Sequence, residues 1–141
     1  MITGMLHTGF VVRDLDEAVR FDRDAIGLTG VATRERNGGP IDQVVGYDNT
    51  HLKIALLNMG GGHVLELIQY VHPTGSERPS EERNTLGAAH LAFNVNDINQ
   101  TYKKLVSHGA HKLNPPIELV PGRWACYLQD PDRNWIELVE A

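Results

Sequence analysis

Two histidines stand at equivalent places in an internal repeat of the sequence. The stretch LHTGFVVRDL at residues 6–15 resembles AHLAFNVNDI at residues 89–98, and this alignment places His7 on His90. Each histidine opens a run of alternating apolar and small or polar residues that is typical of a strand. A lone histidine at a strand start is more often part of the surface or core than a ligand, although imidazole is the commonest protein ligand of metals. The histidines therefore become informative only together with a second repeated group.

Two glutamates repeat in the same way. The stretch HVLELIQ at residues 63–69 resembles NWIELVE at residues 134–140, which aligns Glu66 with Glu137. Both lie among apolar residues of a predicted strand, and an inward carboxylate needs a partner because an unpaired buried charge is costly. If a pseudo-twofold axis relates the two copies, two imidazoles and two carboxylates converge on one point. Such a set suits a divalent first-row metal, so we predict that all four side chains are metal ligands.

Each copy of the repeat predicts one βαβββ module. A strand with alternating apolar residues comes first, and Asp14 in one copy and Asp97 in the other are candidate N-caps of the helix that follows. Gly27 and Gly109 stand where a helix C-terminal glycine is expected. The remaining strands are expected near residues 30–36, 42–57 and 63–70 in the first copy, with a bend or split in 42–57 as the open alternative, and near 111–119, 123–129 and 134–139 in the second.

The chain as a whole has the composition of an ordinary globular protein, and its 141 residues suit one domain. We expect a first module at about residues 1–71, a polar linker at about 72–87 and a second module at about 88–141. A net charge of −5 argues against nucleic acid or an anionic membrane as partner. Cys126 is the single cysteine, which excludes an internal disulfide. The sequence shows no signal peptide or membrane span, so a cytoplasmic location is expected.

The motifs HTGFVVRDLDEAVRF, HVLELIQY, GAAHLAFNVNDI and YLQDPDRNWIELVE resemble the vicinal oxygen chelate superfamily. This superfamily includes glyoxalase I, methylmalonyl-CoA epimerase, extradiol dioxygenases and the fosfomycin- and bleomycin-resistance proteins. The resemblance implies an α+β fold in which two tandem βαβββ modules form an open, incomplete β-barrel around one metal ion, often in a homodimer. The family's ligand positions match His7, Glu66, His90 and Glu137.

The sequence departs from the family pattern at two positions. Asp22 stands where relatives often have tyrosine, and Arg133 stands where they often have glycine. We expect the first departure to alter a contact on the helix face and the second to alter a turn. Neither removes a predicted ligand.

A divalent ion in such a site acts as a Lewis acid on a substrate with vicinal oxygens. The ion is expected to be zinc, nickel, cobalt, manganese or iron(II). In glyoxalase-like relatives metal-bound glutamates act as the base, which implies this role for Glu66 or Glu137; sequence does not distinguish the two. Tyr127, Gln129 and Arg123 are the expected substrate contacts. The alternatives are that Tyr127 caps the mouth of the barrel and that Arg123 is a solvated residue at a strand start, which is the more common case for such an arginine.

The expected function is therefore proton transfer next to a metal-chelated carbonyl, by a lyase, isomerase or epimerase of the glyoxalase I or methylmalonyl-CoA epimerase type. An iron(II) extradiol-type dioxygenase is the first alternative, although a fourth protein ligand would crowd the positions that oxygen and substrate need. A small-molecule-sequestering resistance protein is the second alternative. Such relatives commonly lack the ligand set, whereas all four positions are filled here.

Overall fold

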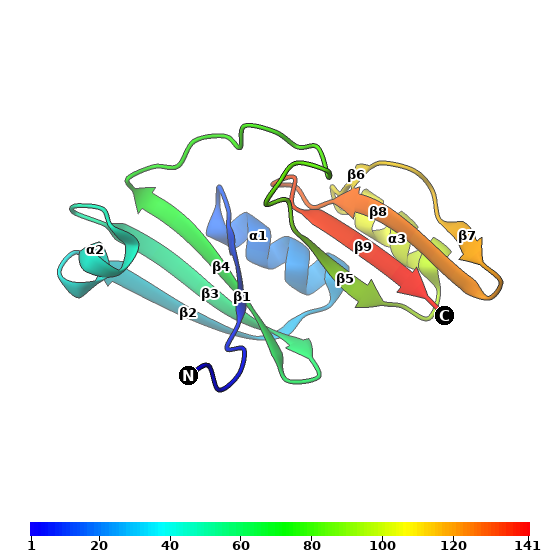
Figure 1. Cartoon of the computed structure of the whole chain (residues 1–141), viewed down its shortest axis with the longest axis horizontal. Coiled ribbons are helices and arrows are strands. Elements are labelled where there is room, and N and C mark those ends of the chain that lie inside the picture. The colour runs from blue at the N-terminus through cyan, green and yellow to red at the C-terminus, as the bar shows by residue number, and fades with distance from the viewer. The chain divides into compact units, whose positions relative to one another are not determined.

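The computed structural model describes all residues from Met1 to Ala141, and the chain divides into two compact units (Figure 1). The first unit comprises Met1–Glu77 and the second Arg78–Ala141. Each unit contains one twisted sheet with a helix packed against it. None of the helices is long and apolar enough to cross a membrane.

The first unit is a four-stranded sheet in the order β1-β4-β3-β2. Strands β1 and β4 pair in parallel, whereas the other neighbours are antiparallel. Its elements are β1 (Thr8–Val11), α1 (Leu15–Phe21), the π-helical turn η1 (Asp22–Ile26), β2 (Thr29–Asn37), α2 (Pro40–Val45), β3 (His51–Gly60) and β4 (His63–His72).

The second unit repeats this topology in the order β5-β9-β8-β6, with the short strand β7 also pairing with β8. Strands β5 and β9 are again parallel. Its elements are β5 (His90–Asn94), α3 (Ile98–Ser107), β6 (His111–Lys112), β7 (Ile117–Val120), β8 (Arg123–Gln129) and β9 (Trp135–Glu140). The predicted α+β class and the two βαβββ modules are confirmed, and neither sheet closes on itself.

The two helices begin where the sequence predicts. The carboxylate Oδ1 of Asp14 accepts a hydrogen bond from the backbone N–H of Glu17 at 3.0 Å. Oδ1 of Asp97 accepts the equivalent bond from Gln100 at 2.8 Å. These bonds satisfy donors that the first turn of a helix leaves without a partner.

One face of each sheet forms the core with its helix. In β4, Leu65 and Leu67 are buried and Glu66 between them is half-buried, as the alternation of a strand requires. In β9, Ile136 and Leu138 are buried on either side of the half-buried Glu137. Both glutamates therefore lie on the sheet face that the helix does not cover.

The predicted strand near residues 42–57 is wrong in its first part, because residues 40–45 form the helix α2. Pro40 occupies the first helical turn, where its missing N–H costs nothing, and Gly46 ends the helix in the left-handed conformation at φ 74°. The carboxylate of Asp42 accepts hydrogen bonds from the backbone N–H groups of Asn49 and Thr50 at 3.1 and 2.8 Å. These hydrogen bonds, together with Pro40 and Gly46 at its two ends, favour the helix.

The predicted strand near residues 111–119 is also interrupted. It forms β6 at His111–Lys112 and β7 at Ile117–Val120, with Pro115 and Pro116 between them. Proline has no backbone N–H to donate to a neighbouring strand, so the ladder cannot continue through this pair.

The turn between β8 and β9 is held by Asp130. Its two carboxylate oxygens accept hydrogen bonds from the backbone N–H and the side-chain amide of Asn134, at 2.8 and 2.9 Å. Burial raises the pKa of Asp130 to about 6, although these hydrogen bonds act in the opposite direction. Arg133 in the same turn has φ 68°, a left-handed conformation that glycine adopts more easily. We expected Arg133, which replaces a glycine of the family pattern, to alter this turn. In the structure the turn keeps the left-handed conformation, and the arginine adopts it with a strained backbone.

Candidate metal and substrate site

The first unit brings His7 and Glu66 together. His7 immediately precedes β1, and Gly9, two residues later, lies directly opposite Glu66 of β4 in the parallel register. The imidazole Nε2 of His7 is 3.2 Å from Oε1 of Glu66. The glutamate side chain is 18% exposed and the histidine side chain 33% exposed. The partner of the half-buried carboxylate in this unit is therefore the predicted histidine.

The second unit contains the same arrangement. His90 is the first residue of β5, and Ala92 lies opposite Glu137 of β9. Nε2 of His90 is 3.2 Å from Oε2 of Glu137. Within each unit the structure places the predicted histidine beside the predicted glutamate, with matching register and distance.

A small residue lies next to each glutamate. A Cβ atom added to Gly9 would lie 3.7 Å from Oε1 of Glu66, an ordinary van der Waals contact. Ala92 supplies that methyl group beside Glu137 in the second unit. The small residue on the neighbouring strand thus leaves space for each carboxylate to extend across that strand toward the histidine.

The neighbouring strand on the other side differs between the units. Leu56 of β3 lies opposite Glu66, whereas Tyr127 of β8 lies opposite Glu137. The Tyr127 hydroxyl is 3.2 Å from Nε2 of His90, and the two rings meet edge to face at 5.2 Å. Burial raises the pKa of Tyr127, and the charge and hydrogen bonding of Glu137 raise it further. The second pair therefore has a phenol beside it, and the first has an aliphatic side chain.

A pocket of about 140 Å³ opens beside the second pair. Its walls are Arg83, Ala88, Ala89, His90, Tyr127 and Trp135. The rings of Tyr127 and Trp135 meet edge to face at 6.3 Å. This pocket can hold a small molecule against a predicted metal ligand and a phenol hydroxyl.

The three predicted substrate contacts lie in different environments. Tyr127 lines the pocket. Gln129 is 6% exposed, and its Nε2 donates to the carbonyl of Arg133 at 3.0 Å, so its amide holds the turn after β8. Arg123 is exposed at the first position of β8, four residues from Tyr127, and is not one of the lining residues.

The sequence did not point to Arg83 as a pocket residue. It belongs to a polar segment that reads as a linker and has no periodicity. Trp135 shares the sheet face of Glu137, as strand parity predicts, but parity alone does not indicate a pocket. The signal that could have found Arg83 is a contact distant in sequence, which a single chain does not reveal.

Neither unit alone gathers three or more histidine, cysteine or carboxylate side chains into a metal-binding cluster. Each contributes one imidazole and one carboxylate. A site with all four predicted ligands therefore requires both pairs.

Comparisons with known proteins cover nearly the whole chain. The sequence profile of the glyoxalase/bleomycin resistance protein/dioxygenase superfamily matches residues 4–138. A 2-epi-5-epi-valiolone epimerase from an Actinomyces species is 30% identical over 143 aligned positions, which cover 94% of this chain and 76% of the relative. A probable lactoylglutathione lyase from a Synechocystis species is 24% identical over 137 positions, which cover 96% of this chain and 94% of the relative. The crystal structure of a glyoxalase family protein from Bacillus cereus matches with a TM-score of 0.86 at 26% identity, over 99% of this chain and 95% of the other.

Proposed function

The chain belongs to the glyoxalase/bleomycin resistance protein/dioxygenase superfamily, and from that premise we propose that it is a metal-dependent enzyme of proton transfer. Its reaction moves a proton on the carbon next to a carbonyl group of a small substrate with vicinal oxygens. The observation that carries the proposal is the histidine–glutamate pair found at 3.2 Å in each unit. An epimerase and a probable lyase among the relatives support this reaction class.

The donor set fits a divalent ion. The residues that would hold it are His7, Glu66, His90 and Glu137, which offer two imidazole nitrogens and two carboxylates. This mixture suits zinc, nickel, cobalt, manganese or iron(II). The two pairs belong either to one chain or to two chains of a homodimer. Partial burial of both carboxylates, at 18% and 23% side-chain exposure, supports a role other than solvation.

The chemistry divides between the ion and the side chains. When bound, a divalent ion supplies Lewis-acid polarisation of a carbonyl oxygen. Glu66 or Glu137 accepts the proton from the adjacent carbon, because a carboxylate within hydrogen-bond reach of that carbon is an adequate base. The returning proton comes from the same carboxylate in an isomerisation, or from the opposite one in an epimerisation.

Tyr127 is the substrate contact that the proposal retains. Its hydroxyl lies in the pocket beside His90 and can donate a hydrogen bond to an oxygen of the substrate. Burial and the neighbouring carboxylate favour the protonated phenol, which is the form that donates. Gln129 contributes by holding the turn after β8.

The test is hydrogen exchange in D2O with a panel of 2-oxo and 2-hydroxy carbonyl compounds, followed by proton NMR while an electrode records dissolved oxygen. We expect deuterium to enter at the carbon next to the carbonyl without oxygen consumption. Glu66→Gln and Glu137→Gln are each expected to abolish exchange, and the exposed Glu17→Gln in α1 is the matched control that retains it.

Two results would count against the proposal. Oxygen uptake that depends on an aromatic diol would indicate a dioxygenase instead. Full exchange in both glutamine variants would remove the carboxylates from the reaction.

A further inference from the structure

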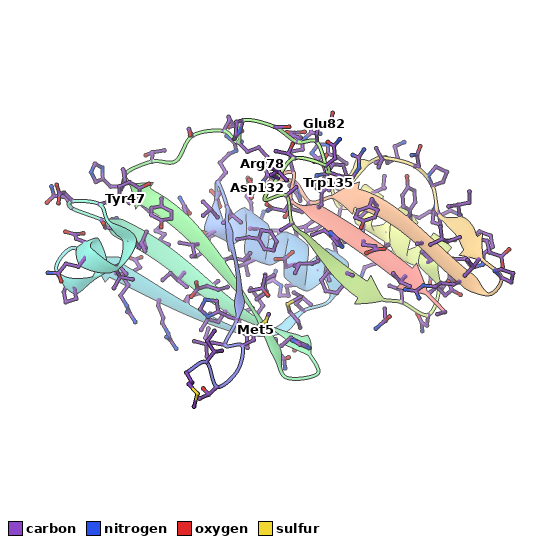
Figure 2. The ribbon with its side chains drawn as sticks, in the orientation of Figure 1. Met5, Tyr47, Arg78, Glu82, Asp132 and Trp135 are labelled. Carbon is purple, nitrogen blue, oxygen red and sulfur yellow. The ribbon has the colours of Figure 1, made fainter.

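The part of the predicted linker from Arg78 onward belongs to the second unit and is anchored there by hydrogen bonds. The guanidinium of Arg78 donates to the backbone carbonyls of Arg133 and Asp132 at 3.1 and 3.2 Å and to Oδ1 of Asn134 at 2.8 Å. Figure 2 shows Arg78, Asp132 and Trp135 close together at one end of this unit. Three hydrogen bonds from one side chain fix where this segment begins on the turn between β8 and β9.

A second anchor brings a cation to the pocket. The indole Nε1 of Trp135 donates to the backbone carbonyl of Glu81 at 3.0 Å. Two residues further on, the guanidinium carbon of Arg83 lies 4.6 Å from the centroid of the Trp135 ring. This cation–π contact fixes the position of the charge, and an arginine side chain carries five N–H donors that can serve a ligand.

The pocket has room for a small ligand group. Its volume of about 140 Å³ is close to the roughly 150 Å³ of an apolar cavity that binds benzene, a molecule of about six non-hydrogen atoms. That is the size of a carboxylate with a short carbon chain. Ala88, Ala89 and the ring of Trp135 provide apolar walls for the carbons, and Arg83 provides the positive charge. His90 at the wall places this group next to the proposed reaction site.

We propose that this pocket binds a carboxylate group of the substrate through the guanidinium of Arg83. The inference rests on the proposed function and narrows its substrate class to small 2-oxo or 2-hydroxy carboxylates. A planar carboxylate matches the paired N–H donors of arginine in a way that a neutral amide cannot. Because the net charge of the chain is −5, the protein as a whole repels an anionic substrate, and the guanidinium of Arg83 supplies a local positive charge that attracts the carboxylate.

The experiment measures binding rather than turnover. The chain has two tryptophans, so Trp124→Phe leaves Trp135 as the only tryptophan, and its fluorescence, excited at the red edge where tyrosine does not absorb, reports occupancy of the pocket. The probes are lactate and lactamide, which share size and vicinal oxygens and differ in charge. We expect lactate to bind roughly tenfold more tightly than lactamide.

Variants at position 83 locate the difference. Arg83→Gln is expected to weaken lactate binding roughly tenfold while leaving lactamide unchanged, and Arg83→Lys to retain part of the affinity because the charge remains. Arg20→Gln, at an exposed arginine in the last turn of α1, removes the same charge elsewhere and should bind like the parent. Circular dichroism confirms that each variant is folded.

Equal affinity for lactate and lactamide, or an unchanged lactate affinity in Arg83→Gln, would overturn the inference. Preferential binding of inorganic phosphate would overturn the assignment to a carboxylate. The metal content of Arg83→Gln separates the two proposals, because the pocket inference predicts the content of the parent chain. Absence of metal from both the parent protein and the Arg83→Gln variant would instead count against the proposed function. The lactate titration would still show whether the pocket binds a carboxylate.

Discussion

The two halves of this molecule share a backbone plan but surround the same two ligand types with different chemistry. In both, a parallel strand pair sets a small residue opposite a glutamate, and a histidine lies 3.2 Å from that carboxylate. The antiparallel neighbour then places Leu56 beside Glu66 and Tyr127 beside Glu137. The strand register therefore places the candidate ligands in the same way in both halves. The residue opposite the glutamate on the antiparallel strand determines whether a hydrogen-bond donor lies beside them.

The turns that precede the two glutamates differ as well. The turn between β3 and β4 has three successive glycines at positive φ, Gly60, Gly61 and Gly62. The turn between β8 and β9 uses the hydrogen bonds of Asp130 and tolerates a left-handed Arg133. One turn depends on backbone freedom and the other on a buried carboxyl group, so only the second is expected to respond to pH.

The largest effect is expected from making the second half resemble the first. Tyr127→Leu removes the hydroxyl beside His90. It is expected to slow deuterium exchange into the substrate by roughly tenfold to a hundredfold, because a hydrogen-bond donor to the charge that develops on the substrate oxygen is lost. Metal content should stay at the parent level, because the phenol is not one of the four proposed ligands. Tyr127→Phe separates the hydroxyl from the ring and should reproduce most of the loss.

If Tyr127→Leu catalyses deuterium exchange into the substrate as fast as the parent protein does, the phenol has no part in the reaction. If it loses metal, Tyr127 supports the ligands rather than the substrate. Either result would remove the functional distinction between the two halves.

A smaller effect concerns the pH response of the turn between β8 and β9. Burial raises the pKa of Asp130 from an ordinary 3.8 to about 6, so between these values the folded chain holds a proton that the unfolded chain has released. The free energy of unfolding therefore falls as pH rises from about 4 to about 6. Each pKa unit is worth about 1.4 kcal/mol, and partial exposure of the carboxyl reduces the total to about 1–2 kcal/mol.

Urea denaturation at several pH values tests this prediction. Asp130→Asn has no proton to release, so the stability of the parent relative to the variant should fall by about 1–2 kcal/mol from pH 4 to pH 7. Parallel pH profiles for the two proteins would show that the carboxyl group is solvated in the folded chain.

The smallest effect comes from the small residues beside the glutamates. Gly9→Ala gives the first half the methyl group that Ala92 provides in the second, at 3.7 Å from the Glu66 carboxylate and without a positive φ at this position. Alanine restricts the unfolded chain, so urea denaturation should show a gain of about 0.5–1 kcal/mol. The same metal affinity is expected. A loss of stability would mean that the two strand pairs are not equivalent.

The sequence predicted the parts of the fold that depend on local patterns. Helix caps at Asp14 and Asp97, strand alternation around Glu66 and the repeat itself all follow from spacing within a few residues. The helix α2 was missed because the hydrogen bonds that the backbone N–H groups of Asn49 and Thr50 donate to Asp42 span seven and eight residues, beyond the short spacings of a strand or helix pattern.

The composition of the pocket was harder to predict. Tyr127 could be proposed from its strand parity, whereas Arg83 lies at the pocket in a segment held by the bonds of Arg78 and Trp135, whose partners are 54 to 56 residues away in sequence. Nothing near Arg83 in the sequence records those bonds. Pairing of the histidines with the glutamates was predictable because the repeat encodes it twice.

Metal stoichiometry tests the central claim most directly. The purified chain, dialysed against each candidate ion and analysed by mass spectrometry, is expected to hold about one ion per chain, since the proposed site uses two histidine–glutamate pairs. Glu66→Gln and Glu137→Gln should each lower the metal affinity by more than the roughly 10–100-fold that loss of an outer hydrogen-bond partner costs. A chain that binds no ion, or two glutamine variants with the affinity of the parent, would contradict the account.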